Sequence, residues 1–217
     1  MKNILLIGLG RFGRHVALKL NELNHQVMAI DKDEERVNEV ISFVTNAQIG
    51  DSTNRDFLAS LGIDNYDVCI VGISDDFQSS LVTVDLLKEL GAKKIIARSC
   101  RDAQHKFLIL GGADEVVYPE KQMAAWTAIR CTSEYVMDYI DINEDYSVFE
   151  IKVPKSWNGK TVRELNLRAM HNINLLGYRS EGKLNMVVHP DDVLSYGQSI
   201  LVLGEHNAVY RCFDINK

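Results

Sequence analysis

Three glycines near the start of the chain have the spacing of a dinucleotide-binding loop. Gly8, Gly10 and Gly13 follow the apolar run 4–7 and open a segment of helical character. In such a loop the first glycine permits a tight turn, the second lets phosphates approach the backbone, and the third lets the helix pack on the strand. The helix N-terminus then offers free N–H groups and a partial positive charge. The pattern predicts binding of a nucleotide through its phosphates.

Acidic and basic residues stand where the rest of a nucleotide would lie. Asp31 ends the second apolar run, where its carboxylate can accept hydrogen bonds from ribose hydroxyls and would repel a 2′-phosphate. Asp51, in "IGDST", has two interpretations that stay open: it faces the adenine, or it caps the next helix. Arg11 lies within the glycine motif and Arg98 at the end of the fifth expected strand, so either can reach a terminal phosphate.

The chain lacks a recognisable set of residues that would use this nucleotide as a reagent. It has no Tyr-x-x-x-Lys pair, no Gly-x-Ser-x-Gly elbow and no Walker A sequence. The histidines are scattered, and the turn in "HPDD" explains that cluster as well as catalysis does. The four cysteines are far apart, and Cys100 with His105 has no second ligand pair for a metal. A binding role is therefore favoured over the alternative, a small NAD(H)-dependent oxidoreductase.

Composition and charge exclude several other classes of protein. The 217 residues are 46% hydrophobic and 25% charged, as in ordinary globular proteins. No apolar stretch reaches the roughly 18–20 residues that a membrane-spanning helix needs, and the N-terminus does not resemble a signal peptide. The net charge of −6 disfavours a broad nucleic-acid surface. We expect a cytoplasmic protein with no nucleic-acid partner.

Alternating strand-like and helix-like segments must position the glycine loop. The expected strands are 3–8, 25–31, 47–51, 66–73, 93–99 and 115–119, and the expected helices are 11–24, 33–44, 52–63, 75–90 and 101–112. Such alternation predicts right-handed βαβ units. The fold class is therefore α/β, with a parallel, Rossmann-like sheet in an N-domain of residues 1–120.

The second part of the chain has a different pattern. Residues 120–140 read as one long helix with an apolar stripe, formed by Met123, Trp126, Ile129, Val136 and Ile140. Such a stripe packs within the subunit or crosses over to a partner subunit. The polar stretch 141–147 reads as a linker. We therefore expect a crossover helix and linker at 121–144.

A small α+β lobe is expected over residues 145–217. A strand at 146–154 precedes a short helix that starts with a capping box of Thr161 and Glu164. Two strand-like runs within 173–188 meet at a turn formed by Glu181 and Gly182. A strand at 199–204 and a helix at 205–213 follow.

The chain resembles the regulatory subunits of bacterial potassium-uptake systems. The stretches "IGLGRFG", "AIDKDEERV", "IGDST", "IIARS" and "YPEKQMA", with an α+β lobe behind them, resemble the Ktr/Trk peripheral proteins. These consist of an RCK (regulator of potassium conductance, also KTN) N-domain and C-domain. With a single glycine motif the chain is most similar to the Ktr type. The resemblance implies an octameric ring of dimers beneath a membrane potassium-translocating subunit, peripheral on the inner face of the cell membrane, with nucleotide controlling the pore.

The resemblance also implies ligands for the N-domain. The family site takes ATP and ADP, and can take NAD or NADH. Its residues match Gly8, Gly10, Phe12, Gly13, Asp31 and Asp51, with Lys32, Asp33, Ser52 and Ser74 beside them. Arg11 matches an arginine that reaches the terminal phosphate of ATP, often across a subunit contact, and Arg98 falls where relatives often have a basic contact, usually lysine. Glu120 matches an acidic residue that helps to bind a divalent cation or sodium; otherwise it is a first-turn acid complementing the helix dipole.

For the C-domain the resemblance implies a second ligand, cyclic di-AMP, between two C-lobes. Arg168 would face a phosphate, and Val162, Asn174 and Pro190 would line the pocket. Alternatively, these residues only pack and cap the lobe. A third function also stays open, in which the chain senses a nucleotide or redox state for a different partner.

Overall fold

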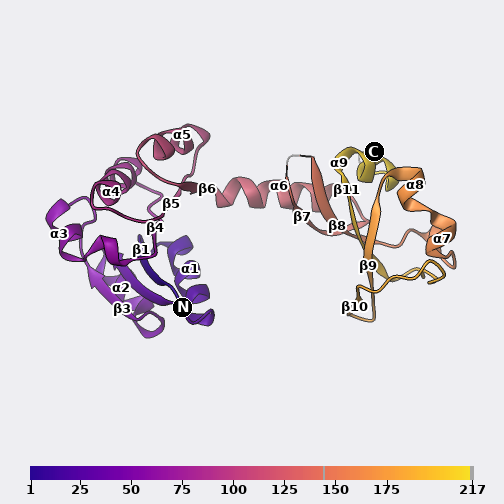
Figure 1. Cartoon of the computed structure of the whole chain (residues 1–217), viewed down its shortest axis with the longest axis horizontal. Coiled ribbons are helices and arrows are strands. Elements are labelled where there is room, and N and C mark those ends of the chain that lie inside the picture. The colour runs from indigo at the N-terminus through magenta and orange to yellow at the C-terminus, as the bar shows by residue number, and fades with distance from the viewer. Residues whose placement is uncertain (144, 216–217) are drawn as a thin grey trace. The chain divides into compact units, whose positions relative to one another are not determined.

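The computed structural model describes residues 1–143 and 145–215, and it divides into two compact units, Met1–Lys121 and Gln122–Lys217 (Figure 1). Each unit has its own sheet and its own hydrophobic core. Within the described ranges, no helix is both long enough and apolar enough to cross a membrane.

The first unit contains a six-stranded parallel sheet with helices between the strands. Its strands are β1 (Asn3–Ile7), β2 (Gln26–Asp31), β3 (Asn46–Ile49), β4 (Val68–Val71), β5 (Ile95–Arg98) and β6 (Glu115–Val117). Its helices are α1 (Arg11–Glu22), α2 (Glu34–Val40), α3 (Arg55–Ser60), α4 (Phe77–Glu89) and α5 (Asp102–Leu110). The strand order is β3-β2-β1-β4-β5-β6. Strands β2 and β3 are added on one side of β1, and β4, β5 and β6 are added on the other side, so the strand order reverses between β1 and β4. Open α/β sheets bind ligands at such a reversal point.

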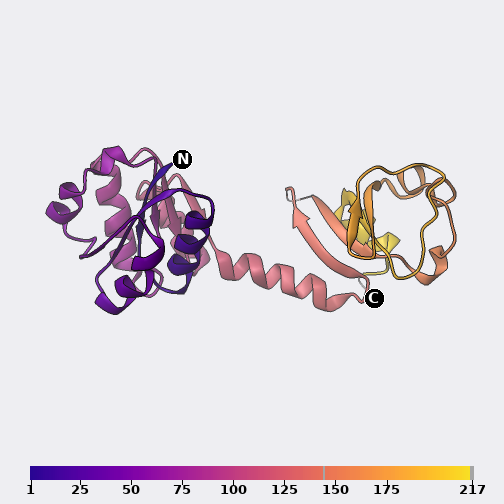
Figure 2. The ribbon, with the colours of Figure 1, turned by 90° about the horizontal axis from the view of Figure 1, so that it is seen from below.

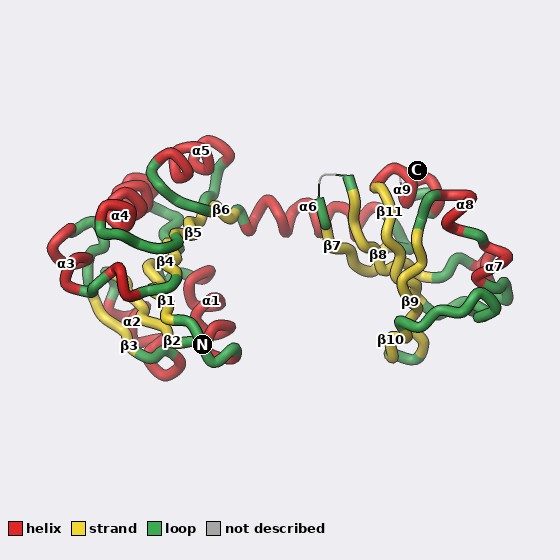
Figure 3. Tube along the Cα trace, viewed as in Figure 1, coloured by secondary structure: helices red, strands yellow, loops and turns green. Residues whose placement is uncertain are grey.

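Both faces of this sheet are covered, which explains the apolar run in β1. Leu5 and Ile7 belong to one buried cluster, together with residues of α3, α4 and α5. Leu6 belongs to another cluster on the opposite face, with Ala17 of α1 and Val37 of α2. A strand buried on both faces needs no polar alternation. The strands, yellow in Figure 3, lie between helices, as the turned view in Figure 2 also shows. The predicted Rossmann-like N-domain fold is confirmed.

Helix α6 (Pro119–Thr132) is shorter than predicted. The expectation of one helix over residues 120–140 is wrong, because Val136–Asp141 forms strand β7. Trp126 and Ile129 do pack on the core of the second unit, but Val136 and Tyr139 enter that core from a strand paired with β8. Pairing with a distant strand overrides a spacing that local periodicity reads as helical.

The polar stretch after β7 is a hairpin connection and not the predicted linker. Asp141 is the last residue of β7, and Tyr146 is the first residue of β8 (Tyr146–Lys152). The N–H groups of Ile142 and Asn143 donate to the carbonyl of Tyr146. Position 144, which ends the range 121–144 predicted for the crossover helix and linker, lies outside the described residues.

The second unit contains a five-stranded antiparallel sheet in the order β10-β9-β11-β8-β7. The remaining elements are α7 (Val162–Leu165), α8 (Leu167–His171), β9 (Asn174–Ser180), β10 (Lys183–Asn185), β11 (Ser199–Glu205) and α9 (His206–Cys212). The capping box of Thr161 and Glu164 is present, and the β9–β10 turn contains Glu181 and Gly182, both at positive φ. One core, with the fully buried Phe149 among its members, holds the sheet and helices together. The predicted α+β lobe is confirmed.

Candidate nucleotide site

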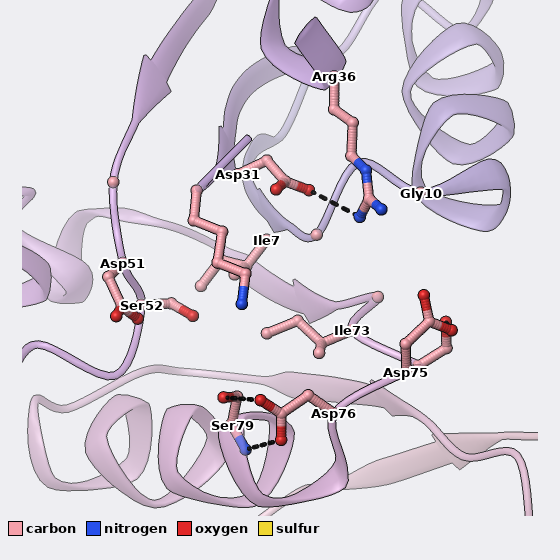
Figure 4. A pocket seen from close by; sticks show the side chains of 15 residues that line it. Ile7, Gly10, Asp31, Arg36, Asp51, Ser52, Ile73, Asp75, Asp76 and Ser79 are labelled. Atoms are coloured by element: carbon pink, nitrogen blue, oxygen red, sulfur yellow. Dashed lines mark hydrogen bonds and ion pairs between the residues drawn. The ribbon is translucent and has the colours of Figure 1, made fainter. Parts of the chain in front are cut away.

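The first unit has a cavity of about 270 Å³ at the carboxyl ends of β1, β2, β3 and β4 (Figure 4). The lining residues are Ile7 at the end of β1 with Gly8 and Gly10 after it, Asp31 at the end of β2 with Lys32 and Arg36 after it, Gly50, Asp51 and Ser52 after β3, and Gly72, Ile73, Ser74, Asp75, Asp76 and Ser79 after β4. The cavity therefore lies at the reversal point of the sheet, beside the glycine loop.

Each glycine of the loop meets a different steric demand. Gly8 has a φ of +90°, and a Cβ there would lie 2.9 Å from the backbone nitrogen of Ile73. A Cβ on Gly13 would lie 2.0 Å from the carbonyl oxygen of Gly8, so the first turn of α1 rests directly on the loop. A Cβ on Gly10 would meet nothing within 4 Å. Gly10 caps α1 without a side-chain hydrogen bond, and the first turn holds no acid, so its N–H groups suit an anion.

The Asp31 carboxylate connects the glycine loop to the turn that follows β2. Its side chain is 6% exposed, its Oδ2 accepts the N–H of Leu9 at 2.7 Å, and its Oδ1 accepts the N–H of Asp33 at 3.0 Å. Each carboxylate oxygen has a second acceptor position. Asp31 therefore has a structural role, and it lines the cavity where the sequence expects a ribose partner.

Removing the Asp31 carboxylate is expected to destabilise the protein. In Asp31→Ala the N–H groups of Leu9 and Asp33 lose their acceptor; the Leu9 N–H is buried, and an unsatisfied buried group costs about 1–3 kcal/mol. Urea unfolding measures the change. Asp56→Ala, an exposed acid in the first turn of α3, is the matched control and should change stability by less than about 0.5 kcal/mol. Equal stability of the two variants would show that the Asp31 contacts contribute nothing.

The wall opposite the glycine loop is acidic. Hydrogen bonds from the backbone and hydroxyl of Thr53, at 2.9 and 2.7 Å, lower the pKa of Asp51. Hydrogen bonds from the hydroxyl and N–H of Ser79, at 2.6 and 3.0 Å, likewise lower the pKa of Asp76, which caps α4. The interpretation of Asp51 as a helix cap is wrong, because Asn54 caps α3. Asp51 instead presents a carboxylate to the cavity.

Other predicted residues on this edge have local roles. Ser52 is 6% exposed, and its hydroxyl forms a 2.8 Å hydrogen bond with that of Thr83 on α4. Ser74 lines the cavity and donates to Asp75. Asp33 caps α2 and accepts the N–H groups of residues 35 and 36, and it is not among the residues that line the cavity.

Arg98, Phe12 and Glu120 form a separate cluster outside the lining of the cavity. The Arg98 guanidinium lies 5.3 Å from the centre of the Phe12 ring and pairs with Glu120 in the first turn of α6. The Arg98 side chain is 12% exposed, and its buried Nε has no hydrogen-bond partner among the described residues. The carboxylate that the resemblance assigns to a cation therefore has an arginine as its counter-charge. The described residues contain no group of three or more His, Cys, Asp or Glu side chains placed to hold a metal ion.

Arg11 does not line the nucleotide cavity. It is exposed on α1 and lines a different hollow with Arg14, His15, Leu18, Glu39 and Phe43. Within one chain the structure does not bring this side chain to the glycine-loop cavity.

In the second unit two of the four predicted residues, Val162 and Pro190, lie on adjoining segments, and Pro190, Arg168 and Asn174 are exposed. The N–H of Val162 donates to the carbonyl of residue 192, and the N–H of residue 163 donates to the carbonyl of Pro190 at 2.8 Å, so the Val162 and Pro190 segments adjoin. Val162 also packs on the core. Arg168 is exposed on α8, and Asn174 is exposed at the start of β9.

Several residues of the cavity were missed by the sequence patterns. Arg36 lies in the charged run "DKDEERV", which reads as a solvated helix face, and Asp76 and Ser79 lie at the start of α4. They lie at or near the start of the helices that follow β2 and β4, and this is the signal that could have identified them, because these strands end at one edge of a parallel sheet.

Comparisons with known proteins agree with this architecture. Residues 4–119 match the TrkA-N domain, and residues 148–215 match the TrkA-C domain. The Ktr system potassium uptake protein A of Bacillus subtilis (strain 168) is 33% identical over 97% of this chain and 95% of its own length. The Ktr system potassium uptake protein C of the same organism is 37% identical over 89% of this chain and 90% of its own length.

Solved structures of the GsuK channel share the fold. The GsuK RCK domain superposes with a TM-score of 0.70 at 18% identity, over 100% of this chain and 48% of that chain. The GsuK channel bound to NAD superposes with a TM-score of 0.68 at 18% identity, over 95% of this chain and 38% of that chain. This chain thus spans about half or less of the GsuK chains.

These matches decide between the classes of function that the sequence left open. Both units match domains of potassium-uptake proteins, and the Bacillus relatives match along almost their whole length. The Bacillus relatives are potassium uptake proteins of Ktr systems, so the oxidoreductase alternative is set aside. The chain belongs to the TrkA-N/TrkA-C (RCK) family of regulatory subunits of Ktr and Trk potassium uptake systems.

Proposed function

We propose that this protein senses an adenine nucleotide and thereby gates a membrane potassium-translocating partner. The observation that carries the proposal is the cavity beside the glycine loop, with the N-terminus of α1, which has no side-chain cap, at one end and Asp31 beside it. The free N–H groups of a helix N-terminus attract phosphate, and a carboxylate accepts hydrogen bonds from ribose hydroxyls. In a chain related to potassium uptake proteins, such a site supplies a signal to a partner.

The preferred ligands are ATP and ADP, with NAD or NADH as further ligands of the same site. The GsuK channel, whose fold is similar, has been solved bound to NAD, which supports a nucleotide as a ligand of this fold. Because Asp31 lines the cavity and repels a 2′-phosphate, we expect NADP to bind more weakly than NAD.

The proposed mechanism needs a ligand that distinguishes two states of an assembly. A ligand shifts an equilibrium only by its difference in affinity for the two states. Arg11 is exposed and lies outside the cavity of its own chain, which suits an arginine that reaches the third phosphate of ATP in a neighbouring subunit. ADP lacks that phosphate, so the two nucleotides would favour different arrangements. We propose an octameric ring of dimers on the cytoplasmic side of the membrane partner.

A second ligand, cyclic di-AMP, is proposed for the C-lobe. The exposed Arg168 offers a cation to a phosphate, and Val162 and Pro190 each offer an apolar side chain on adjoining segments. A cation bound through Glu120 would have to replace Arg98 as the partner of that carboxylate.

A thermal-unfolding panel tests the nucleotide proposal. The full chain is heated with ATP, ADP, NAD, NADH or cyclic di-AMP, and the midpoint of unfolding is recorded. A ligand at 100 times its Kd stabilises by about 2.7 kcal/mol, so ATP and ADP should raise the midpoint by several degrees. Stabilisation by neither ATP nor ADP would contradict the proposal, and stabilisation by NADH alone would revive an oxidoreductase. Failure of cyclic di-AMP alone would remove only the second ligand.

A further inference from the structure

The charge of the cavity wall does not suit a polyphosphate without local compensation. Of the described residues that line the cavity, four are aspartates, Asp31, Asp51, Asp75 and Asp76, and two are cations, Lys32 and Arg36. A nucleoside diphosphate brings further negative charge. Besides the N–H groups at the N-terminus of α1, a cation on the glycine-loop side of the cavity would offset that charge.

Lys32 is associated with the opposite, acidic wall. The pKa of Asp51 is lowered mainly by the hydrogen bonds from Thr53, and the positive charge of Lys32 lowers it further. The pKa of Asp76 is likewise lowered mainly by the hydrogen bonds from Ser79, with a smaller contribution from Lys32. Lys32 thus offsets carboxylates that follow β3 and β4.

Arg36 lies on the glycine-loop side and is held by two carboxylates. Its Nη1 lies 3.8 Å from Oδ2 of Asp31, and its Nε lies 3.5 Å from Oδ2 of Asp33. Figure 4 shows the side chain reaching from α2 toward Asp31. Both contacts are longer than the roughly 2.7–2.9 Å of a charge-assisted hydrogen bond, and the side chain is 46% exposed. The carboxylates orient the guanidinium and leave its donors available to a stronger acceptor.

One oxygen connects Arg36 to the glycine loop. Oδ2 of Asp31 accepts the N–H of Leu9 at 2.7 Å, and the same oxygen faces the Arg36 guanidinium. Leu9 lies between Gly8 and Gly10, so Asp31 links the Arg36 guanidinium to the backbone just before α1. Beside Gly10 the structure leaves open space. The Arg36 guanidinium and the N-terminus of α1 therefore border the same end of the cavity.

We propose that Arg36 donates hydrogen bonds to a phosphate of the nucleotide bound in its own chain. This inference rests on the proposed function and adds a phosphate-binding residue to it. The planar guanidinium suits the oxygens of a phosphate and can bind two of them together. The ligand class is an adenosine 5′-phosphate whose phosphates lie at the glycine loop, and Asp31 and Asp33 keep the arginine in place before the ligand arrives.

Binding measurements with and without phosphates test this role. Calorimetry of the full chain gives the affinity for ADP, and NMR titration gives the weaker affinity for adenosine. In Arg36→Gln, ADP should bind about 10- to 100-fold more weakly, as expected for a lost charged hydrogen bond, and adenosine should change less than about twofold. Arg36→Lys keeps the positive charge but loses the planar guanidinium, so its affinity for ADP should lie between those of the unaltered protein and Arg36→Gln. Arg55→Gln is the control, because Arg55 has similar exposure, pairs with Glu89 and does not line the cavity.

Three outcomes would overturn the inference. If ADP and adenosine weaken by the same factor, Arg36 only positions Asp31. If ADP binds Arg36→Gln as it binds the unaltered protein, Arg36 does not contact the phosphates. If the unaltered protein binds no adenine nucleotide, the proposed function fails and the inference with it. The first two outcomes leave nucleotide sensing intact, so the two failures are distinguishable.

Discussion

Gly13→Ala is expected to destabilise the first unit and to abolish nucleotide binding. The new Cβ would lie 2.0 Å from the carbonyl oxygen of Gly8, which is backbone at the turn between β1 and α1. Relief of this clash requires α1 to move off the sheet, and overpacking of this kind costs about 1–3 kcal/mol or more. The same movement displaces the N–H groups that face the cavity. Urea unfolding followed by circular dichroism measures the stability, and calorimetry with ADP measures the binding.

The outcome of this substitution separates two views of the third glycine. If Gly13→Ala unfolds at the same urea concentration as the unaltered protein, the close approach of α1 to the loop does not restrict this position. If it is destabilised but binds ADP with unchanged affinity, the position of α1 does not determine the phosphate site.

Gly10→Ala is expected to have the opposite profile, with nearly intact stability and lost binding. Gly10 has a φ of −60° and a ψ of −174°, which any residue adopts, and a Cβ there meets nothing within 4 Å. Stability should fall by less than about 1 kcal/mol, because alanine is a poorer N-cap than glycine but restricts the unfolded chain. The added methyl group projects where a phosphate must approach the backbone, so ADP should bind at least about tenfold more weakly.

Together the two glycine substitutions form a matched pair, because each adds one methyl group to the same loop. Calorimetry with ADP and urea unfolding are applied to both variants. Unchanged ADP affinity in Gly10→Ala would show that the phosphates do not approach the loop at this position, and the nucleotide site would have to be sought elsewhere.

The first unit could be predicted closely because its signals are local. The runs that became β1, β2 and β4 are apolar, as strands buried in a parallel sheet are. The glycine spacing then determines the turn into α1, and this turn does not depend on contacts with distant parts of the chain. These features are encoded within short windows, so periodicity and turn chemistry suffice to find them.

Strand β7 could not be predicted from such windows. Val136 and Ile140 continue the helical spacing of Trp126 and Ile129, and the sequence alone offers no reason to end the helix at Thr132. What selects a strand is pairing with β8, which buries Tyr139 against Phe149 with ring centres 5.8 Å apart. That partner becomes visible only when the lobe is assembled.

Some residues of the cavity can likewise be found from the local sequence, whereas others can be found only from the folded structure. Gly8, Gly10 and Asp31 follow strands whose ends are readable, and they do line it. Arg36 was missed because a charged helix start is usually solvated. The side chains of Arg98 and Glu120 come from β5 and α6, and only the folded structure shows that they pair with each other and do not line the cavity.

Potassium flux through the membrane partner, reconstituted in vesicles with this protein, tests nucleotide control most directly. Flux is measured with ATP and with ADP at concentrations that saturate the site, using the unaltered protein and Gly10→Ala. We expect flux to differ between the two nucleotides with the unaltered protein and to be the same with Gly10→Ala. Identical flux with ATP and ADP, while calorimetry shows both bound to the unaltered protein, would contradict nucleotide control of the pore.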